Sequence, residues 1–334
     1  MAKRKKQTWV ITKLLKMLPT ALLVMLMCVG ICLGALIETG LVSLTGVQQA
    51  IGFAPSETPE GADIPDEAKS FSVHVIDVGQ GDSILILAGG KSILIDAGEK
   101  EYGKKVVSFI KEKGIEKLDY IIATHPHSDH IGGMAEVISS VGAEKIIVPK
   151  LPDNMVPTTR VYENFLKSVK SSGGKLTAAK AGMVYNIAEI NGLPVKMTVL
   201  TPCEGAEYDD LNNYSVAVRV DYNRISWLLA GDLSEEGEKD LIKSGADIDV
   251  TAYKVSHHGS SSSSTDKLLE RITPRLCVIS CGEGNSYGHP HKETMNRLSE
   301  YTSSIYRTDI RSTVSVYSDG TKLYVAKSSS QGGE

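Results

Sequence analysis

The most constraining feature of this sequence is a group of four residues that bind metals readily, placed within six positions: His125, His127, Asp129 and His130. An apolar run at 120–123 leads directly into this group and an amphipathic helical pattern follows it, so the group lies in the turn after a strand. Such a turn can splay alternate side chains, so that His125 and His127 face one ion while Asp129 and His130 reach a second. Burying these polar groups together is costly unless something coordinates them, and imidazole and carboxylate suit Zn²⁺ and related ions. The sequence therefore predicts a metal site at the end of this strand.

The other histidines follow the same pattern. Seven of the eight histidines fall in three short loops, each after a predicted strand. The two later loops hold His257 and His258, and His289 and His291. His74 lies apart from them inside a predicted strand, and we expect it to be an ordinary structural residue. The sequence thus concentrates its histidines at strand exits.

Short apolar runs rich in β-branched residues recur after residue 70, and helical patterns separate many of them. Strands are predicted at 71–77, 82–87, 92–96, 118–123, 145–149, 195–200, 215–220, 225–230, 250–255, 276–280, 312–317 and 321–326. Helices are predicted near 103–113, 131–140, 160–171, 234–243, 264–271 and 292–300. This order indicates a layered α/β protein with mixed sheets. We expect one folded domain at 71–327, followed by a disordered tail at 328–334.

The N-terminal part of the chain differs in composition from the rest. Residues 1–16 carry six basic side chains and no acidic one, and residues 17–37 form an uncharged apolar span. That span is long enough for one transmembrane anchor, and the basic residues before it predict a cytoplasmic N-terminus and an extracytoplasmic body. A cleaved signal peptide is the alternative, although no Ala-x-Ala site is evident. Residues 38–70 are expected to be a linker, since 56–70 contains two prolines and five acids.

The net charge of the body limits the class of substrate. The chain has 36 Lys and Arg against 40 Asp and Glu, so without the six basic residues of 1–16 the remainder is 30 against 40, a net charge of −10. An acidic body is a poor general nucleic-acid binder, because affinity for phosphate comes from Lys and Arg. A polyanionic substrate must therefore be met by a local basic patch or by metal ions.

Six short segments of the body follow one another in a recognisable order. They are Asp77-Val78-Gly79-Gln80-Gly81-Asp82, Ile95-Asp96-Ala97-Gly98, the 125–130 cluster, Leu229-Ala230-Gly231-Asp232-Leu233, Lys254-Val255-Ser256-His257-His258-Gly259-Ser260 and Tyr287-Gly288-His289-Pro290-His291. With these segments the chain resembles the metallo-β-lactamase superfamily, and within it the hydrolase-like domain of the ComEC (ComA-like) competence proteins. The resemblance runs from Phe71 to Ala326. It implies an αββα sandwich whose loops meet at one edge of two sheets, with a single anchor where ComEC proteins have a multi-span channel.

The resemblance also implies a ligand set for two divalent metal ions, Zn²⁺ or Mn²⁺. The first two histidines of the cluster would hold the first ion, and Asp129 and His130 the second. Asp232 matches the carboxylate that bridges both ions; the alternative is that it caps the helix that opens after it. Asp96 matches the acid that orients the histidine loop through hydrogen bonds.

Two features depart from the pattern or leave it open, and the first concerns the first ion. Many members of the superfamily place a further histidine before the bridging carboxylate, but residues 211–215 contain none. We therefore expect the first site to bind its ion more weakly than the second. An asparagine of this stretch could bind the ion weakly or contact the substrate, and Asn213 and Ser215 are the candidates for substrate contact.

The second concerns the last metal ligand, which can come from either of two loops. By its position after the next strand, His289 matches the final histidine of the family, and we assign it to the metal. His257 and His258 follow the strand after Asp232, and each is left between ligand and proton donor. The role of His291 stays open.

These features favour a hydrolase that acts on a phosphodiester outside the membrane, and the ComEC likeness alone points to DNA. Asp129 would position or deprotonate the attacking water, and His257 or His258 would protonate the leaving oxygen. The hydroxyls and amides of residues 260–265, beginning with Ser260, lie at a predicted helix start and are candidates to hold phosphate.

Two other functions compete with this one. The same site could hydrolyse a small or cell-envelope ester, such as a teichoic-acid phosphodiester, a lactone or a thioester. An aromatic content of 6% slightly favours that substrate class, because it offers little sign of base-stacking surfaces. The chain could instead be a non-catalytic binding module, but the intact cluster argues against this, since a retired site can lose its ligands at no cost.

Overall fold

A computed structural model describes residues 61 and 63–328 of the chain. The predicted basic segment (1–16), the predicted anchor (17–37), most of the predicted linker (38–70) and most of the expected tail (328–334) lie outside the described residues. Within the part that is described, no helix is both long and apolar enough to cross a bilayer. The end of the expected linker, Asp66–Ser70, forms a 3-10 helix, η1, that buries Ala68. Regular structure is thus already present before residue 71.

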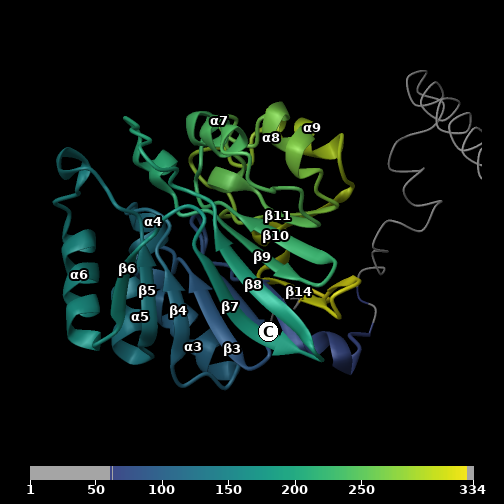
Figure 1. Cartoon of the computed structure of the whole chain (residues 1–334), viewed down its shortest axis with the longest axis horizontal. Helices are drawn as coiled ribbons and strands as arrows, with labels where there is room; N and C mark the ends of the chain where they lie inside the picture. The colour runs from purple at the N-terminus through teal and green to yellow at the C-terminus, as the bar shows by residue number, and fades with distance from the viewer. Residues whose placement is uncertain (1–60, 62, 329–334) are drawn as a thin grey trace, which may run out of the picture. The chain divides into compact units, whose positions relative to one another are not determined.

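Two β-sheets form the centre of the described residues (Figure 1). The first contains β1 (Phe71–Val75), β2 (Ile84–Ala88), β3 (Lys91–Ile95), β4 (Leu118–Ile122), β5 (Ala143–Val148), β6 (Lys175–Ala178), β14 (Val314–Ser318) and β15 (Leu323–Val325), in the order β15-β14-β1-β2-β3-β4-β5-β6. The second contains β7 (Val184–Ile190), β8 (Leu193–Val199), β9 (Val218–Tyr222), β10 (Ile225–Leu229), β11 (Ala252–Lys254), β12 (Leu276–Ile279) and β13 (Ser304–Arg307), in the order β13-β12-β11-β10-β9-β8-β7.

Helices lie in the connections between these strands. The α-helices are α3 (Gly103–Glu112), α4 (Ser128–Ile131), α5 (Met134–Ser140), α6 (Arg160–Ser172), α7 (Glu235–Lys243), α8 (Asp266–Ile272), α9 (Lys292–Ser299) and α10 (Thr308–Arg311). The other 3-10 helices are η2 (Lys100–Tyr102), η3 (Asp153–Met155), η4 (Leu211–Tyr214) and η5 (Ser256–Gly259). Helix α6 illustrates how the sequence sets the bounds of an element: Thr159 caps its first turn, and Gly173 ends it in a left-handed conformation.

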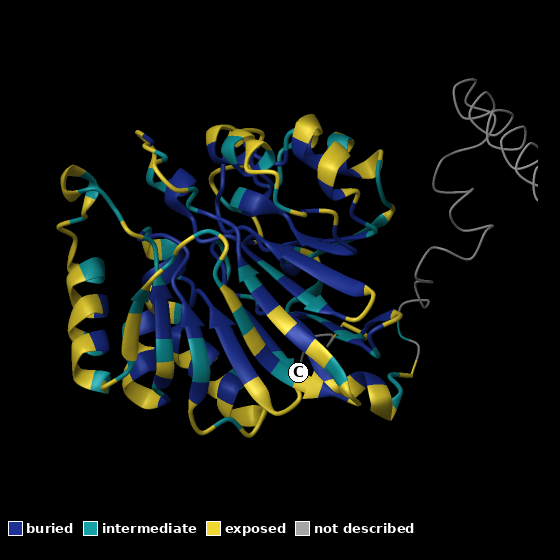
Figure 2. Cartoon of the chain, viewed as in Figure 1, coloured by how far each residue is buried: buried dark blue, intermediate teal, exposed yellow. Residues whose placement is uncertain are grey.

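Three apolar clusters define the layers. Figure 2 shows that buried residues predominate in the strands, whereas the helices expose one face. The largest lies between the two sheets and includes Val73, Ile86, Trp227 and Val278. A second joins the first sheet to α3, α5 and α6 through side chains such as Val106, Val137 and Phe165. A third joins the second sheet to α7, α8 and α9 through Leu241, Leu268 and Leu298. The predicted α/β sandwich of two sheets is therefore confirmed for the described residues.

The strand directions determine where the connecting loops emerge. In the first sheet β3, β4, β5 and β6 run parallel to one another, and in the second sheet β10, β11, β12 and β13 do the same. Because the carboxyl ends of parallel strands meet at one edge, each sheet gathers the loops that follow these strands. All three histidine-bearing loops follow strands of these two sets.

His74 is held inside the first sheet by two hydroxyls. Its Nε2 atom lies 2.9 Å from Ser72 Oγ and its Nδ1 atom 2.8 Å from Ser315 Oγ, and the residue is fully buried. Burial lowers the pKa of His74 to about 3, and the positive charge of Lys113 acts in the same direction. The expectation of an ordinary structural histidine agrees with these contacts.

This burial predicts a loss of stability in acid. The pKa of His74 is depressed in the folded chain, so the unfolded chain binds a proton first as the pH falls below 6.5. The folded state should lose about 2 kcal/mol by pH 5 from this residue alone. Urea unfolding of the metal-free protein at pH 7 and pH 5, for wild type and His74→Gln, measures it. Equal acid losses in the two proteins would show that His74 contributes nothing.

Candidate metal centre

Loops from both sheets bring the polar residues together. The loop after β3 carries Asp96, the loop after β4 carries the 125–130 cluster, and the loop after β10 carries Asp232. Gly231 has a φ of +53°, and a Cβ atom there would lie 2.9 Å from Thr124 Cβ. Only glycine lets the loop after β10 come so close to the loop after β4.

Four side chains form a tight group at this point: their ligand atoms all lie within 4.8 Å of one another, and they are Asp129, His130, Asp232 and His258. Asp232 Oδ2 lies 3.2 Å from His130 Nε2 and 3.4 Å from His258 Nε2. Asp129 Oδ2 lies 3.2 Å from His258 Nε2 and 3.6 Å from His130 Nε2. Asp232 does not cap the following helix, because the residue in the N-cap position of α7 is Ser234.

Several buried atoms of this group have no hydrogen-bond partner among the described residues. They include His130 Nε2, His258 Nε2 and Asp232 Oδ1. Buried polar atoms left unpaired are rare because each one costs free energy. Two imidazole nitrogens and two carboxylates that converge on one point are a donor set for a divalent transition metal. The residues present therefore fit such an ion.

Hydrogen bonds on the far side of each ring fix which nitrogen faces the group. His130 Nδ1 donates to Asp96 Oδ2 at 2.7 Å, and His258 Nδ1 donates to the Ser280 carbonyl at 3.0 Å. Asp96 also accepts hydrogen bonds from the amide and the hydroxyl of Thr124. Both rings thus present an Nε2 lone pair to the centre, and Asp96 holds the histidine loop as the resemblance implied.

The electrostatics of the group call for positive charge at its centre. Burial acts to raise the pKa of Asp232, but His130 and His258 outweigh it and hold that pKa well below its ordinary value. The pKa of Asp129 is lowered in the same way, with His130 and His258 opposing the effect of burial. Both carboxylates are therefore ionised at neutral pH, and protons on the two histidines or a divalent ion must balance them.

The first two histidines of the cluster form a looser pair. His125 Nε2 lies 3.0 Å from His127 Nδ1 and 3.9 Å from Asp232 Oδ2. Burial lowers the pKa of His125 well below its ordinary value, so this imidazole is neutral and able to bind a metal. Neither histidine belongs to the tight group. Ser215 Oγ lies on the other side of the ring, 3.4 Å from His125 Nδ1, and accepts the Asp232 amide at 3.1 Å.

Asn213, a candidate for substrate contact, is engaged elsewhere in the structure. Its Oδ1 atom accepts the amides of Ser234 and Gly237, both at 3.1 Å, and its Nδ2 atom donates to Glu236 Oε2. These bonds hold the start of α7 in place. The described residues therefore provide no third nitrogen ligand from the 211–215 stretch.

This difference between the two sets predicts unequal metal binding. The tight group should keep its ion, whereas the His125–His127 pair should lose its ion readily. Elemental analysis after dialysis should find closer to one metal than two per chain, rising towards two when Mn²⁺ or Zn²⁺ is added. Two ions that survive a chelator would contradict the expected weakness of the first site.

The loop after β12 carries His289 and His291 near the group but not in it. His289 Nδ1 lies 3.5 Å from Gln80 Nε2, and its ring stacks on Tyr287 with centroids 5.6 Å apart. Its ring centroid is 6.2 Å from that of His258. Burial, with His258 acting in the same direction, lowers the pKa of His289 to about 4. The sequence assigned the last metal ligand to His289, but the structure brings His258 into the group instead.

His291 serves the loop itself. Its Nδ1 atom accepts the Ser261 amide at 2.9 Å, and its Nε2 atom donates to the Tyr287 carbonyl at 3.1 Å. Both ring nitrogens are therefore used in backbone contacts.

His257 and His258 reach the site through an unusual backbone. Both residues have positive φ, 50° and 55°, although neither is glycine. Consecutive left-handed residues are strained and persist only where the surroundings enforce them. The His257 amide donates to the Gly231 carbonyl at 3.1 Å, and its Nε2 atom lies 3.7 Å from Asp232 Oδ2. The turn thus aims two adjacent rings at the same carboxylate.

A buried ion pair beneath His258 was not singled out from the sequence. Lys254 Nζ lies 2.5 Å from Asp82 Oδ2, and both side chains are at most 1% exposed. Asp82 Oδ1 lies 3.3 Å from His258 Nδ1. Burial acts to raise the pKa of Asp82, but the charges of Lys254 and His258 outweigh it. The pKa is therefore lowered overall, and the carboxylate is ionised. A lysine inside an otherwise apolar strand was the available signal for such a pair.

The groups that were expected to hold phosphate at 260–265 are in part bound to another side chain of the protein. The amides of Ser264 and Thr265 donate to Glu238, at 2.5 and 3.0 Å, and the Thr265 hydroxyl donates to it at 2.7 Å. Glu238 is fully buried, so a carboxylate of the chain already occupies this helix start. Ser260 lies in the same loop with its hydroxyl 3.0 Å from that of Ser262.

The sequence matches one family model and is similar to several curated bacterial proteins. Residues 76–283 match the family model described as the metallo-beta-lactamase superfamily. ComE operon protein 3 of Bacillus subtilis is 30% identical over 72% of this chain and 32% of its own length. Recombination protein 2 of Haemophilus influenzae is 27% identical over 74% and 29%, and competence protein ComA of Neisseria gonorrhoeae is 27% identical over 78% and 33%. The chain thus spans about a third of the length of these curated relatives.

Proposed function

Because the chain belongs to the metallo-β-lactamase superfamily, we propose that it is a metal-dependent phosphodiesterase that cleaves DNA. The proposal of metal-dependent hydrolysis rests on the tight group of Asp129, His130, Asp232 and His258. This group contains buried nitrogen and oxygen atoms that have no hydrogen-bond partner among the described residues. The choice of DNA is supported by two of the relatives, whose names refer to recombination and to competence.

Side-chain exposure separates ligands from reacting residues among the members of the tight group and the adjacent His257. The side chains of His130, Asp232 and His258 are 0%, 3% and 2% exposed, which suits ligands that the substrate does not touch. Those of Asp129 and His257 are 27% and 23% exposed. These two residues are the ones that a substrate and its attacking water could reach.

The roles follow from this division. Bound divalent ions would supply the Lewis acidity that polarises the phosphoryl oxygens and makes water more acidic. Asp129 is placed to orient the attacking water and to take up its proton. His257, partly exposed and 3.7 Å from Asp232 Oδ2, is placed to protonate the leaving oxygen. His258, which the sequence left between two roles, then acts as a ligand.

A second substrate class is kept for a specific reason. The net charge of −10 after residue 16 opposes binding of a polyanion and favours a small, uncharged ester, such as a lactone or a thioester. The same residues would serve that reaction.

A substrate panel separates these possibilities. The full chain, supplied with Mn²⁺ or Zn²⁺, is incubated with DNA, with bis-p-nitrophenyl phosphate and with lactones, and Asp232→Asn is the matched control. Cleavage of DNA that disappears in the control supports the proposal. Lactone hydrolysis without phosphodiester cleavage would instead identify the protein as a hydrolase of small esters.

We also propose that residues 17–37 anchor the chain in the membrane with the hydrolase outside. The six basic residues of 1–16 and the uncharged apolar span after them support this orientation. Alkaline phosphatase fused to the C-terminus should be active, and a reporter that works only in the cytoplasm should be silent. The reverse pattern would overturn the orientation.

A further inference from the structure

The segment Asp77–Asp82 has no part in the chemistry proposed above, yet it lies between the two halves of the metal centre. The Asp82 amide donates to the Asp129 carbonyl at 3.1 Å, and the Ser280 hydroxyl donates to the Gly81 carbonyl at 2.7 Å. Gly81 has a φ of +139°, and a Cβ atom there would collide with the Asp129 carbonyl. The segment is thus in contact both with the metal-binding loop of the first sheet and with the end of β12 in the second.

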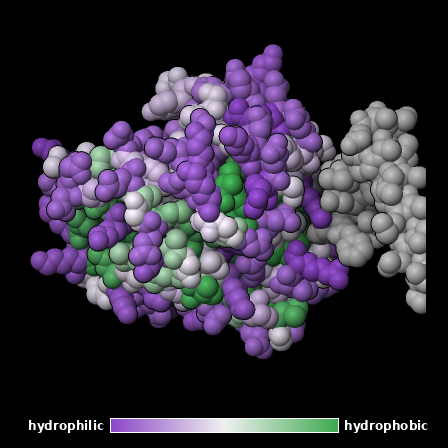
Figure 3. Space-filling model, turned by 45° about the horizontal axis from the view of Figure 1, so that its top comes forward, coloured by the Kyte–Doolittle hydropathy of each residue, from purple (hydrophilic) through white to green (hydrophobic). Residues whose placement is uncertain are grey.

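An ion pair at the end of this segment joins the two sheets. Asp82 lies shortly before β2 of the first sheet, and Lys254 is the last residue of β11 in the second. The Lys254 side chain is 0% exposed, whereas the other lysines that form ion pairs in the described part of the chain are 47% to 76% exposed. Hydrophilic residues cover most of the face seen in Figure 3, where charged side chains remain solvated. Because burying two charges costs about as much as their attraction returns, stability alone does not account for this pair.

The second carboxylate oxygen of Asp82 lies beside a ring of the tight group. Asp82 Oδ2 accepts from Lys254, whereas Oδ1 is buried, has no hydrogen-bond partner among the described residues and lies 3.3 Å from His258 Nδ1. That nitrogen already donates to the Ser280 carbonyl at 3.0 Å, and the Nε2 atom of the same ring belongs to the tight group. A negative charge beside Nδ1 favours the tautomer that carries its proton there, and it makes the Nε2 lone pair a stronger metal ligand.

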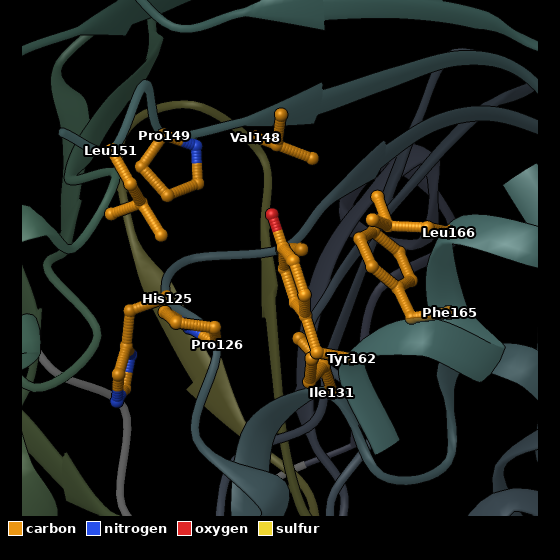
Figure 4. Close-up of a pocket in the computed structure, with 10 residues that line it drawn as sticks. His125, Pro126, Ile131, Val148, Pro149, Leu151, Tyr162, Phe165 and Leu166 are labelled. Carbon is orange, nitrogen blue, oxygen red and sulfur yellow. The ribbon is translucent and has the colours of Figure 1, made fainter. Parts of the chain in front are cut away.

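The surroundings of His125, outside the tight group, are different. Figure 4 shows it at the edge of an apolar hollow with Tyr162 in the middle. Its Nδ1 atom lies 3.1 Å from the hydroxyl of Thr124 and 3.4 Å from that of Ser215, both of them neutral groups. Carboxylates, in contrast, lie behind both histidines of the tight group. The histidines that converge on one point are therefore the ones that a negative charge supports from behind.

We infer that Asp82 and Lys254 are positioning residues of the metal centre: Asp82 keeps the proton of His258 on Nδ1, and Lys254 holds Asp82 in place. Asp82 also belongs, with Asp96 and His130, to a second group whose possible ligand atoms lie within 4.8 Å of one another. The Lys254 ammonium therefore has a further effect, because it ties up a carboxylate that would otherwise compete for the ion. The inference rests on the proposed function, since it requires that the tight group binds a divalent ion.

Metal affinity and the stability of the metal-free protein, measured on the full chain, test this apart from hydrolysis. Zn²⁺ affinity is measured by competition with a chromophoric chelator, and the melting temperature of the metal-free protein by calorimetry. The double variant Asp82→Asn/Lys254→Met removes both charges at similar volume, so its melting temperature should stay close to that of wild type. Its Zn²⁺ affinity should nevertheless fall about 10- to 100-fold. Each single variant should also melt earlier, because it leaves one buried charge unpaired.

A second ion pair of the same fold provides the matched control. Lys91, the first residue of β3, pairs with Asp119 of β4 at 2.7 Å, and both precede the strand ends that carry the site. The double variant Lys91→Met/Asp119→Asn should therefore leave the Zn²⁺ affinity unchanged.

The outcomes separate the inference from the proposed function. Wild-type Zn²⁺ affinity in the double variant of Asp82 and Lys254 would overturn the positioning role and leave the proposed function standing. Weak binding by the single variants that the double variant restores would overturn it too, because the balance of buried charge would then be all that matters. Weaker binding by the double variant at an unchanged melting temperature would support the positioning role, even if the wild type cleaved no DNA. A wild type that binds no Zn²⁺ would overturn the metal centre itself.

Discussion

Replacing Asp232 by alanine is expected to remove both hydrolysis and metal. Asp232 Oδ2 is the one atom within 4 Å of Nε2 atoms from four histidines among the described residues: His125, His130, His257 and His258. Without this carboxylate the histidines lose the negative charge that balances a bound cation. Turnover should fall by about a thousandfold or more, equivalent to about 4 kcal/mol in the transition state. Metal content after dialysis should fall with it.

Two further variants make this result specific. Asp232→Asn keeps the shape of the side chain and removes only its charge, so it should also lose activity and metal if charge is what matters. Asp209→Ala removes an exposed carboxylate from the loop before η4 and should change neither. Full metal content in Asp232→Ala would mean that the ions are held by other residues.

The second large effect separates the two adjacent histidines. His258 is buried with an unpaired Nε2 atom in the tight group, so His258→Ala should shed metal and lose activity on every substrate. His257 is partly exposed, so His257→Ala should keep its metal but cleave DNA about 10²- to 10⁴-fold more slowly. The loss should shrink for bis-p-nitrophenyl phosphate, because a nitrophenolate leaves without a proton.

The ratio of the two activities is the deciding measurement. The activity on bis-p-nitrophenyl phosphate divided by the activity on DNA should rise in His257→Ala. The same ratio should not change in Asp232→Asn. His291→Ala removes a ring that hydrogen-bonds to two backbone atoms and packs against His289, outside the tight group, so it controls for damage to the loops. If His258→Ala kept its metal and slowed only DNA cleavage, the roles of the two histidines would be reversed.

Local sequence spacing was sufficient to predict the first part of the site. Asp129 and His130 lie in one turn after one strand, so their distances depend on a few backbone angles. Asp232 needed the resemblance, because it comes from the other sheet and only the packing of the two sheets brings it to the histidine loop. The structure places all three in the tight group.

The fourth member of the tight group, His258, could not be predicted from the spacing of residues in the sequence. The family pattern favoured His289, because it follows the strand after which the family's final histidine is placed. The loop that holds His258 follows a neighbouring strand of the same parallel set, so position alone could not decide between them. The outcome depends on the left-handed backbone at His258 and on the Ser280 carbonyl that holds its ring. Neither has a local sequence signal.

The fold shows the same division between local and non-local signals. Strands β1 and β10 are buried along their whole length and appear as mainly apolar runs, so they were predicted. Strands β6, β7 and β13 were not predicted. They are edge strands of the two sheets with partly exposed side chains, and β7 also contains an irregular register between Asn186 and Ala188. Half-solvated edge strands need polar residues, which weakens the apolar pattern.

The left-handed backbone at His257 and His258 has a consequence for selection in the laboratory. Each such residue costs on the order of 1–3 kcal/mol, a cost that glycine largely avoids. A library screened only for heat resistance should therefore enrich glycine or asparagine at these two positions. The same clones should be the inactive ones, because replacing either histidine removes a ring that lies beside Asp232. Substitutions in this loop that raise thermal stability are thus expected to lower activity. Raising stability without losing activity will require stabilising changes elsewhere in the two sheets or their helices.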